Sequence, residues 1–212
     1  MKLYTFFRSG TSHRLRIALN LKGLTCESVS LDLRRDEHLT EAFKAINPQQ
    51  LLPALEVDGQ VLTQSPALIE WLEERHPQPP LLPTDLNDRA RVRALAAIIG
   101  CDIHPINNRR ILQALTRRFG ADDAAINDWC GTWITQGFDA FDALRLSHGW
   151  TGRFTHGDQP SLADVYLVPQ MESARRFKVD LGRWPRLQAI DEACGQLPAF
   201  RDAAPRAQPD AS

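Results

Sequence analysis

The sequence of 212 residues, with a mass of 23.9 kDa, is long enough to bury one large hydrophobic core or two small ones without disulfides or metals. Hydrophobic residues make up 43% and charged residues 24%, which is close to the globular average and argues against a disordered chain. Lysine and arginine number 25 against 26 aspartates and glutamates, so the formal net charge of -1 argues against a dedicated nucleic-acid binder.

Strands and helices are predicted to alternate at the start of the chain. The apolar and aromatic run at residues 3–7 predicts a buried strand, and the helical spacing of apolar residues after Ser12 predicts a helix that ends near Gly23. Alternation at residues 27–33 predicts a second strand, and helical spacing returns at residues 39–46. The chain therefore begins with two strand–helix pairs.

A hairpin and a third helix complete this pattern. The Asp-Gly pair at residues 58–59 supplies the positive φ values of a tight turn and joins predicted strands at residues 54–57 and 60–63. The Ser-Pro pair at residues 65–66 favours a helix start, because serine can cap the helix and proline suits its first turn. The resulting order, β-α-β-α-β-β-α, is the thioredoxin topology.

A proline-rich stretch precedes a second half in which the patterns are helical. Residues 77–87 hold four prolines, a density that predicts a linker. Beyond it, apolar residues recur at helical spacing in four segments, at residues 89–119, 124–146, 162–177 and 187–197. Ser161 and Asp164 form a capping-box pattern that predicts the start of the third segment.

These segments predict two domains. An α/β domain of thioredoxin-like topology occupies residues 1–80, a linker occupies residues 81–88, and an all-α helical bundle occupies residues 89–212. The tail at residues 203–212 is rich in proline and alanine, and we expect it to fray.

The chain carries no apolar run near the ~20 residues of a membrane span, and its first residues lack the apolar core of a signal peptide. We therefore expect a cytoplasmic protein. Its cysteines form no Cys-x-x-Cys pair and no Cys/His pair at zinc spacing, so we expect no metal site. We interpret all four as buried free thiols: Cys26, Cys101, Cys130 and Cys194.

Three motifs carry a resemblance to the soluble glutathione transferases. Residues 8–19, Arg-Ser-Gly-Thr-Ser-His-Arg-Leu-Arg-Ile-Ala-Leu, resemble the zeta-class signature, usually Ser-Ser-Cys-x-x-Arg-Val-Arg-Ile-Ala-Leu, with Thr11 in place of the class cysteine. Residues 47–48 with residues 52–55 resemble the family's cis-proline loop, and residues 64–67 resemble its Gln-Ser glutathione-binding turn. The resemblance covers essentially the whole chain and implies the glutathione transferase fold.

The resemblance also implies an activity. Zeta-class enzymes use glutathione to isomerise maleyl oxo-acids to their fumaryl forms. Residues 101–110, together with Gly10 and Thr11, are most similar to the bacterial maleylpyruvate isomerases of gentisate breakdown. Maleylacetoacetate, from tyrosine breakdown, stays open as the alternative substrate, because both compounds carry two carboxylates. A homodimer is expected, as in the family.

The residues between the first strand and the first helix suit a thiolate. Gly10 permits a tight turn and a close backbone approach, and free N–H groups with the helix dipole favour an anion there. A thiol titrates near ~8.5, so hydroxyl donors are needed to hold glutathione as the reactive thiolate. We expect Ser9, ahead of Thr11, to supply that donor; a plain helix cap is the structural alternative.

Other residues are expected to hold the rest of glutathione. A cis peptide bond between Leu52 and Pro53 would let the Leu52 backbone pair with the cysteinyl part. Gln64 and Ser65, at a helix start, suit the γ-glutamyl carboxylate. The resemblance adds four residues from the second half of the chain, namely His104, Asn108, Arg109 and Arg110. His104 and Asn108 are four residues apart, which would place them on one helix face.

A dicarboxylate substrate needs fixed positive charge, and arginine pairs both oxygens of a carboxylate. We expect Arg8, Arg110 and Arg176 to form this clamp, with Arg109 a weaker candidate. Any one of them alone could equally be a solvated surface arginine.

The resemblance implies reversible addition of the glutathione thiolate to the cis double bond, rotation about the resulting single bond, and release of the trans product. A general glutathione transferase would use the same thiolate site with a more apolar substrate pocket. A binding protein on the same fold would show no turnover. A disulfide reductase fits poorly, because Thr11 stands where such an enzyme needs a cysteine.

Overall fold

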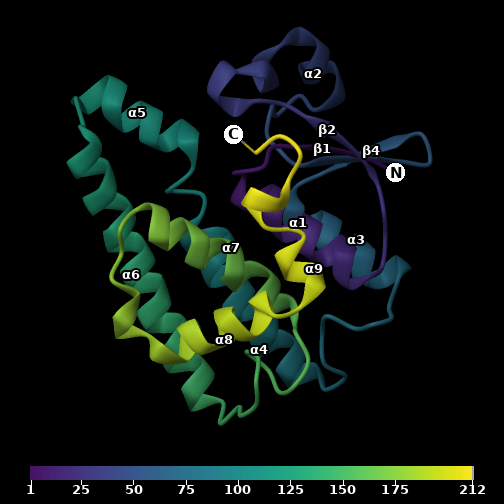
Figure 1. The fold of residues 1–212 in the computed structure, drawn as a ribbon, viewed down its shortest axis with the longest axis vertical. Helices are drawn as coiled ribbons and strands as arrows, with labels where there is room; N and C mark the ends of the chain where they lie inside the picture. Colours follow the sequence, from purple (N-terminus) through teal and green to yellow (C-terminus); the bar gives the residue numbers. More distant parts are fainter. Residues whose placement is uncertain (212) are drawn as a thin grey trace. The chain divides into compact units, whose positions relative to one another are not determined.

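A computed structural model of the protein describes residues 1–211, which form two compact units. The first unit comprises Met1–Pro80 together with the segment that starts at Gly195, and the second comprises Leu81–Cys194. Figure 1 shows the ribbon coloured along the chain.

The first unit is built on a four-stranded mixed sheet. Its strands are β1 (Lys2–Thr5), β2 (Glu27–Ser30), β3 (Ala54–Val57) and β4 (Gln60–Thr63), in the spatial order β2-β1-β3-β4. β1 pairs parallel with β2 and antiparallel with β3, and β3 pairs antiparallel with β4. The predicted order of strands along the chain and the predicted hairpin are confirmed. β1 ends at Thr5, two residues before the predicted end, because the chain then turns towards the first helix.

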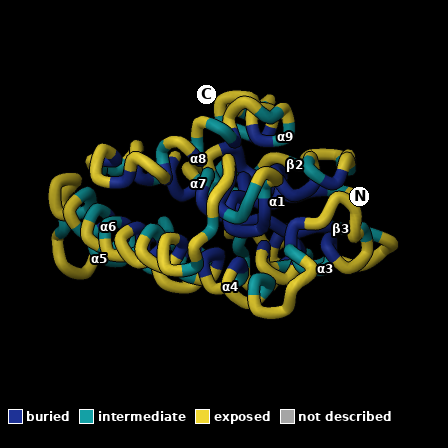
Figure 2. Tube along the Cα trace, turned by 90° about the horizontal axis from the view of Figure 1, so that it is seen from below, coloured by how far each residue is buried: buried dark blue, intermediate teal, exposed yellow. Residues whose placement is uncertain are grey.

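The helices of the first unit bury its core. α1 (Gly10–Leu21) packs against α3 (Ser65–Arg75), and both bury leucines completely. α2 (Glu41–Ile46) follows two short 3-10 turns and adds Phe43 to a second cluster. The other buried members of that cluster are Tyr4, Phe6, Phe7, Leu52 and Ala54. In Figure 2 the trace of α1 is largely dark blue, in keeping with a helix that is buried along most of its length.

The second unit is helical, as predicted. Its elements are α4 (Leu86–Ala97), a π-helical turn η3 (Ile98–Ile103), α5 (Arg109–Phe119), α6 (Asp123–Ser147), α7 (Leu162–Arg176), a 3-10 turn (Leu181–Arg183) and α8 (Pro185–Gly195). η3 packs against α6 where Gly137 leaves room, since a Cβ there would lie 2.2 Å from Ile103 Cδ1.

The long helix predicted over residues 89–119 is interrupted, and the predicted shared face of His104 and Asn108 is wrong. Helical structure stops at Ile103, and a turn that contains Pro105 separates it from α5. Pro105 cannot donate a backbone N–H, which favours a break at this point. Asn108 is therefore the N-cap of a new helix, where its Oδ1 accepts the N–H of Arg110 at 3.2 Å.

The capping box at the start of α7 is confirmed, and it is larger than the sequence motif. Asp164 is fully buried and accepts hydrogen bonds from the backbone N–H and the hydroxyl of Ser161, at 2.7 and 2.9 Å. It also accepts the N–H and hydroxyl of Thr155, at 2.9 and 2.6 Å. The carboxylate thus ties the loop before α7 to the first turn of that helix.

The carboxyl-terminal segment departs from the prediction. Residues 195–211 pack with the first unit, whereas the predicted boundary gave them to the helical bundle at 89–212. The short helix α9 (Pro198–Arg201) contacts α1 (Figure 1), and Ala203 is buried. The expectation that the tail at residues 203–212 frays is wrong for its described residues, because a side chain of α1 holds its backbone: Arg16 Nε donates to Ala203 O at 3.0 Å.

The cysteines are free thiols, as predicted, but not all are buried. Burial raises the pKa of Cys130 to about 12 and also raises that of Cys194. Cys101 is exposed and Cys26 is half-buried, so the prediction of burial is wrong for these two.

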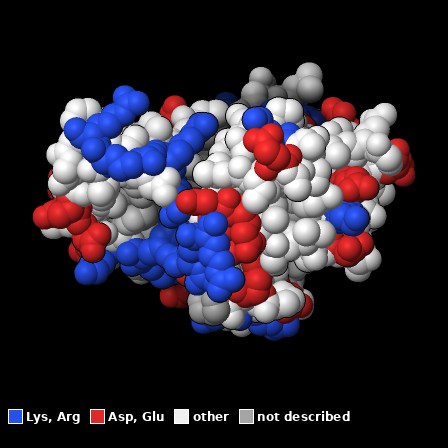
Figure 3. All heavy atoms as spheres, turned by 90° about the horizontal axis from the view of Figure 1, so that it is seen from above, with Lys and Arg blue, Asp and Glu red and all other residues white. Residues whose placement is uncertain are grey.

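The surface carries both signs of charge. Figure 3 shows lysine and arginine interspersed with aspartate and glutamate over one face, in keeping with the net charge of -1. Within residues 1–211, the structure offers no helix with the length and apolar character of a membrane span. The same residues contain no group of three or more His, Cys, Asp or Glu side chains placed to hold a metal ion.

Candidate functional site

The hydroxyl groups predicted to face a sulfur lie at the N-terminus of α1, in residues 8–12, here called the entry loop. Ser9 is the N-cap of α1, and its Oγ accepts the N–H of Ser12 at 3.2 Å. Gly10 follows as the first helical residue. The other N–H groups of this first turn, together with the helix dipole, favour negative charge at this end of α1.

A row of hydrogen bonds runs through the entry loop. Thr11 Oγ1 donates to the carbonyl of Leu52 at 2.8 Å, and Ser9 Oγ lies 2.9 Å from Thr11 Oγ1. A hydroxyl has one proton, and that of Thr11 goes to Leu52, so Ser9 is the donor in the Ser9–Thr11 bond. The Ser9 proton is therefore the one that can turn to a ligand without breaking the Thr11–Leu52 bond.

The loop between Pro48 and Pro53, here called the proline loop, lies beside this row of hydrogen bonds. The peptide bond between Leu52 and Pro53 is cis, as predicted. Asn47 is buried and holds the loop from within, because its Nδ2 donates to Leu51 O at 2.7 Å and its Oδ1 accepts the N–H of Gln49 at 3.1 Å. Leu52 is thereby fixed by Asn47 on one side and by Thr11 on the other.

The start of α3 presents an unusual pair of residues. Gln64 has a φ of 68°, a left-handed conformation that non-glycine residues rarely adopt and that tends to occur at functional sites. Ser65 is buried, and among the residues that the structure describes its Oγ has no hydrogen-bond partner. A buried hydroxyl without a partner at a helix N-terminus is suited to donate a hydrogen bond to a carboxylate ligand.

The residues predicted in the second unit gather at the break between η3 and α5. His104 ends the π-helical turn, Asn108 caps α5, and Arg109 and Arg110 form its first turn. Two arginines at a helix N-terminus oppose the helix dipole, which favours negative charge there. Such a local conflict often marks a residue kept for function rather than for stability. The turn itself is held by Trp129, whose Nε1 donates to Ile106 O at 3.1 Å.

The two arginines at the end of α7 differ in their partners. Arg175 is paired with Asp191 of α8. The Arg176 guanidinium lies over the Phe177 ring, 4.9 Å from its centroid, and Nη2 donates to Ser173 Oγ at 3.2 Å. These two contacts hold the Arg176 guanidinium close to the end of α7. Arg8 is exposed in the entry loop.

Sequence reasoning missed two features near these residues. Asn107 is buried, and both polar atoms of its side chain lack a hydrogen-bond partner within the described part of the chain. Asp210 accepts a hydrogen bond from the N–H of Phe7, just before the entry loop. Neither carries a local signal, since one is an asparagine in a loop and the other lies 203 positions from its partner.

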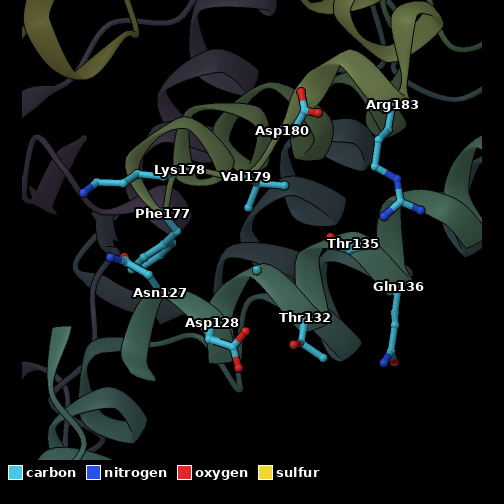
Figure 4. A pocket seen from close by; sticks show the side chains of 11 residues that line it. Asn127, Asp128, Thr132, Thr135, Gln136, Phe177, Lys178, Val179, Asp180 and Arg183 are labelled. Carbon is cyan, nitrogen blue, oxygen red and sulfur yellow. The ribbon is translucent and has the colours of Figure 1, made fainter. Parts of the chain in front are cut away.

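A separate groove of about 670 Å³ lies on the second unit, between α6 and the residues that follow α7. Figure 4 shows Lys178 and Asn127 towards one end of it and Arg183 and Gln136 towards the other. Its described lining consists of residues other than the predicted site residues. Basic and acidic side chains both line it, so it favours neither sign of ligand charge.

Comparison with known proteins identifies the family. Residues 3–80 match the model of the glutathione S-transferase N-terminal domain. The chain is 66% identical to a maleylpyruvate isomerase from Ralstonia sp., over the full length of both. A solved holo structure described as a zeta-class bacterial maleylpyruvate isomerase aligns over all of both chains, with a TM-score of 0.99 and 66% identity.

A second solved structure, the maleylacetoacetate isomerase of Anaeromyxobacter dehalogenans with bound glutathione, is 43% identical. The alignment covers 100% of this chain and 97% of that one, with a TM-score of 0.89. The predicted family and fold are confirmed by these matches. The chain belongs to the zeta class of glutathione S-transferases.

Proposed function

We propose that this protein is a glutathione-dependent cis–trans isomerase that converts maleylpyruvate to fumarylpyruvate. The hydrogen-bonded row through Ser9, Thr11 and Leu52 carries the proposal, because it joins a hydroxyl donor to a fixed backbone carbonyl beside a cis proline. That pairing suits an extended cysteinyl peptide whose sulfur reacts as a thiolate. The full-length similarity to the Ralstonia maleylpyruvate isomerase supports the substrate.

The residues of the first unit fit glutathione as the cofactor. The Leu52 backbone would hold the cysteinyl part, while Gln64, Ser65 and the first N–H groups of α3 would hold the γ-glutamyl carboxylate. The Oγ of Ser65 is buried and has no hydrogen-bond partner in the part of the chain that the structure describes, and this supports the assignment, which gives that hydroxyl a partner. From the family resemblance we also assign His104, Asn108 and Arg109 to glutathione.

When bound, glutathione supplies the thiolate that adds to the cis double bond and leaves again after rotation. The Ser9 hydroxyl would donate a hydrogen bond to the thiolate sulfur and so lower the pKa of the thiol, as donors to a charged form do. The Ser12 N–H, already bonded to Ser9 Oγ, polarises that hydroxyl further. The Thr11 hydroxyl already donates its hydrogen bond to the Leu52 carbonyl. We therefore assign to Thr11 the role of orienting Ser9 and the proline loop.

The arginines would bind the oxo-acid. Arg8, Arg110 and Arg176 can each pair with a carboxylate or with the oxygen on which negative charge builds during thiolate addition. The Asn108 cap supports this role for Arg110 because it holds the backbone N–H of that residue.

The test is an absorbance assay of the purified protein with maleylpyruvate, with and without glutathione, run alongside maleylacetoacetate. We expect turnover that requires glutathione and a higher kcat/KM for maleylpyruvate. A higher kcat/KM for maleylacetoacetate would reassign the substrate. Glutathione binding without turnover of either compound would contradict the isomerase and favour a general transferase or a binding protein.

We also propose a cytoplasmic homodimer. The four free cysteines support a compartment that keeps thiols reduced, as does a cofactor that must itself be reduced. The dimer rests on the family resemblance. Sedimentation equilibrium should give twice the chain mass of 23.9 kDa, and a value of one chain mass at micromolar concentration would contradict it.

A further inference from the structure

The carboxyl-terminal segment reaches the residue that leads into the entry loop. Asp210 Oδ2 accepts the backbone N–H of Phe7 at 3.0 Å. Phe7 directly precedes Arg8 and Ser9, which the proposed function places on the substrate and on the glutathione sulfur. A carboxylate far away in sequence thus holds the backbone one residue upstream of the loop.

Hydrogen bonds hold the backbone of the turn at residues 6–9 at several points. Ser9 N donates to Phe6 O at 3.0 Å, which closes the turn. Arg16 of α1 donates to Phe7 O through Nη2 at 3.0 Å and lies 3.4 Å from Phe6 O through Nη1. Asp210 takes the remaining group, the Phe7 N–H. The path of the chain into the entry loop is therefore set by one arginine and one aspartate.

The same arginine holds the carboxyl-terminal segment. Arg16 is 6% exposed, and its Nε donates to Ala203 O at 3.0 Å. Burial lowers the pKa of Arg16 to about 10, and the nearby negative charge of Asp210 acts in the opposite direction. Gln208 steadies the stretch between the two contacts, because its Nε2 donates to Asp202 O and Ala204 O at 2.9 and 3.0 Å. Asp210 therefore lies on a segment whose backbone is held by hydrogen bonds from the side chains of Arg16 and Gln208.

We propose that Asp210 is a positioning residue for the glutathione site, acting through the Phe7 N–H on the placement of Ser9 and Arg8. The inference rests on the proposed function for the roles of those two residues. Without the Asp210 carboxylate, the Phe7 N–H loses its partner, and the turn keeps only the Arg16 contacts and the Ser9 N to Phe6 O hydrogen bond. A hydrogen-bond donor that is displaced from its best position stabilises a thiolate less, because small displacements of the groups in a site weaken binding and slow the reaction.

The experiment compares Asp210→Ala with the unmodified protein, by calorimetric titration of glutathione and by thiolate absorbance of bound glutathione against pH. The loss of one hydrogen bond predicts an affinity for glutathione about five-fold weaker, together with a higher pKa of the bound thiol. Asp210→Asn keeps an acceptor for the Phe7 N–H and should recover most of the affinity. Melting temperatures are recorded for each variant.

Asp202→Ala is the matched control, because Asp202 is an exposed carboxylate on the same segment and its side chain pairs with the adjacent Arg201. We expect it to bind glutathione as the unmodified protein does. Unchanged affinity and thiol pKa in Asp210→Ala, or equal losses in Asp202→Ala, would overturn the positioning role. A lower melting temperature with an unchanged thiol pKa would make Asp210 merely structural.

Neither readout needs turnover, so the two proposals fail separately. If the unmodified protein binds glutathione but isomerises nothing, the proposed function fails and Asp210 is still judged from binding. If the unmodified protein binds no glutathione, both are overturned.

Discussion

The hydroxyls of Ser9 and Thr11 stand two residues apart in one loop, and their hydrogen bonds distinguish them. Thr11 donates across 41 positions of sequence to Leu52, while Ser9 accepts from the helix and donates to Thr11. Thr11 therefore fixes the proline loop, and Ser9 holds a proton that can turn to another acceptor without breaking the Thr11–Leu52 bond.

This difference predicts unequal effects of two substitutions. Ser9→Ala should raise the pKa of the bound glutathione thiol by about one to two units, because a hydrogen bond to a charged group is lost. Thr11→Val should leave that pKa close to its original value and raise the KM for glutathione roughly five-fold, because the proline loop loses its tie. Thiolate absorbance against pH and initial rates measure the two effects. Thr11→Ser should restore the KM, and an equal pKa rise in Thr11→Val would contradict the assignment.

The end of α7 offers a matched pair of arginines. Arg176→Ala should lower kcat/KM for the dicarboxylate roughly 30-fold, the effect of one lost charge-assisted contact, while glutathione affinity stays unchanged. Arg175→Ala is the control, because Arg175 is already paired with Asp191. Equal losses of kcat/KM in the two variants would remove Arg176 from the clamp.

At the scale of the element, the start of α7 depends on one buried carboxylate. Asp164 is bonded to two backbone N–H groups and two hydroxyls, all buried. Asp164→Ala should lower the free energy of unfolding by at least about 3 kcal/mol, since several buried donors lose their acceptor at once. Asp122→Ala removes the exposed N-cap of α6 and should cost only about 1 kcal/mol. Urea unfolding measures both, and equal costs would contradict the role of burial.

α1 carries a buried histidine, His13, that makes the free energy of unfolding of the protein depend on pH. Burial, together with Arg16 and Arg14, lowers the pKa of His13 to about 3. In the unfolded chain His13 binds its proton near pH ~6.5, so the unfolded state takes up more protons and the free energy of unfolding falls as the pH is lowered. Between pH 6.5 and 5 the loss from His13 should be about 2 kcal/mol. Urea unfolding of His13→Asn should show a correspondingly shallower fall, and an unchanged pH dependence would contradict it.

At the scale of the whole molecule, the chain divides between a sheet-based unit and a helical unit, and the first unit is completed by residues from the far end of the sequence. Arg16 and Asn20 of α1 bind backbone carbonyls of that distant segment, at Ala203 and Ala199. The first unit therefore includes the segment that follows the helical unit in the sequence. For this reason we expect substitutions near residue 210 to affect the first unit rather than the helical unit.

Much of the architecture was predictable because its signals are local. The Asp-Gly hairpin at residues 58–59, the capping box at Asp164 and the helix that begins at Ser65 each depend on residues a few positions apart, and the structure has all three. The prediction that Ser65 caps its helix is wrong, because Gln64 is the N-cap of α3 and the cap has no side-chain hydrogen bond. The helical spacing over residues 89–119 does not reveal the break at Pro105, because a proline in a helical pattern can either bend a helix or end it. The surroundings in the fold decided that it ends.

By itself the sequence determined the thioredoxin topology, the helical second half and the residue types needed for a thiolate site, since periodicity, turn chemistry and capping are read from neighbouring residues. Only the tertiary structure decided which hydroxyl holds the proline loop and that the tail is anchored. It also decided that the polar side-chain atoms of Asn107 and Ser65 are buried without a hydrogen-bond partner among residues 1–211. These features depend on contacts such as Thr11 to Leu52 and Phe7 to Asp210. Contacts between residues far apart in the chain leave no local pattern, because they form only when folding brings the two segments together.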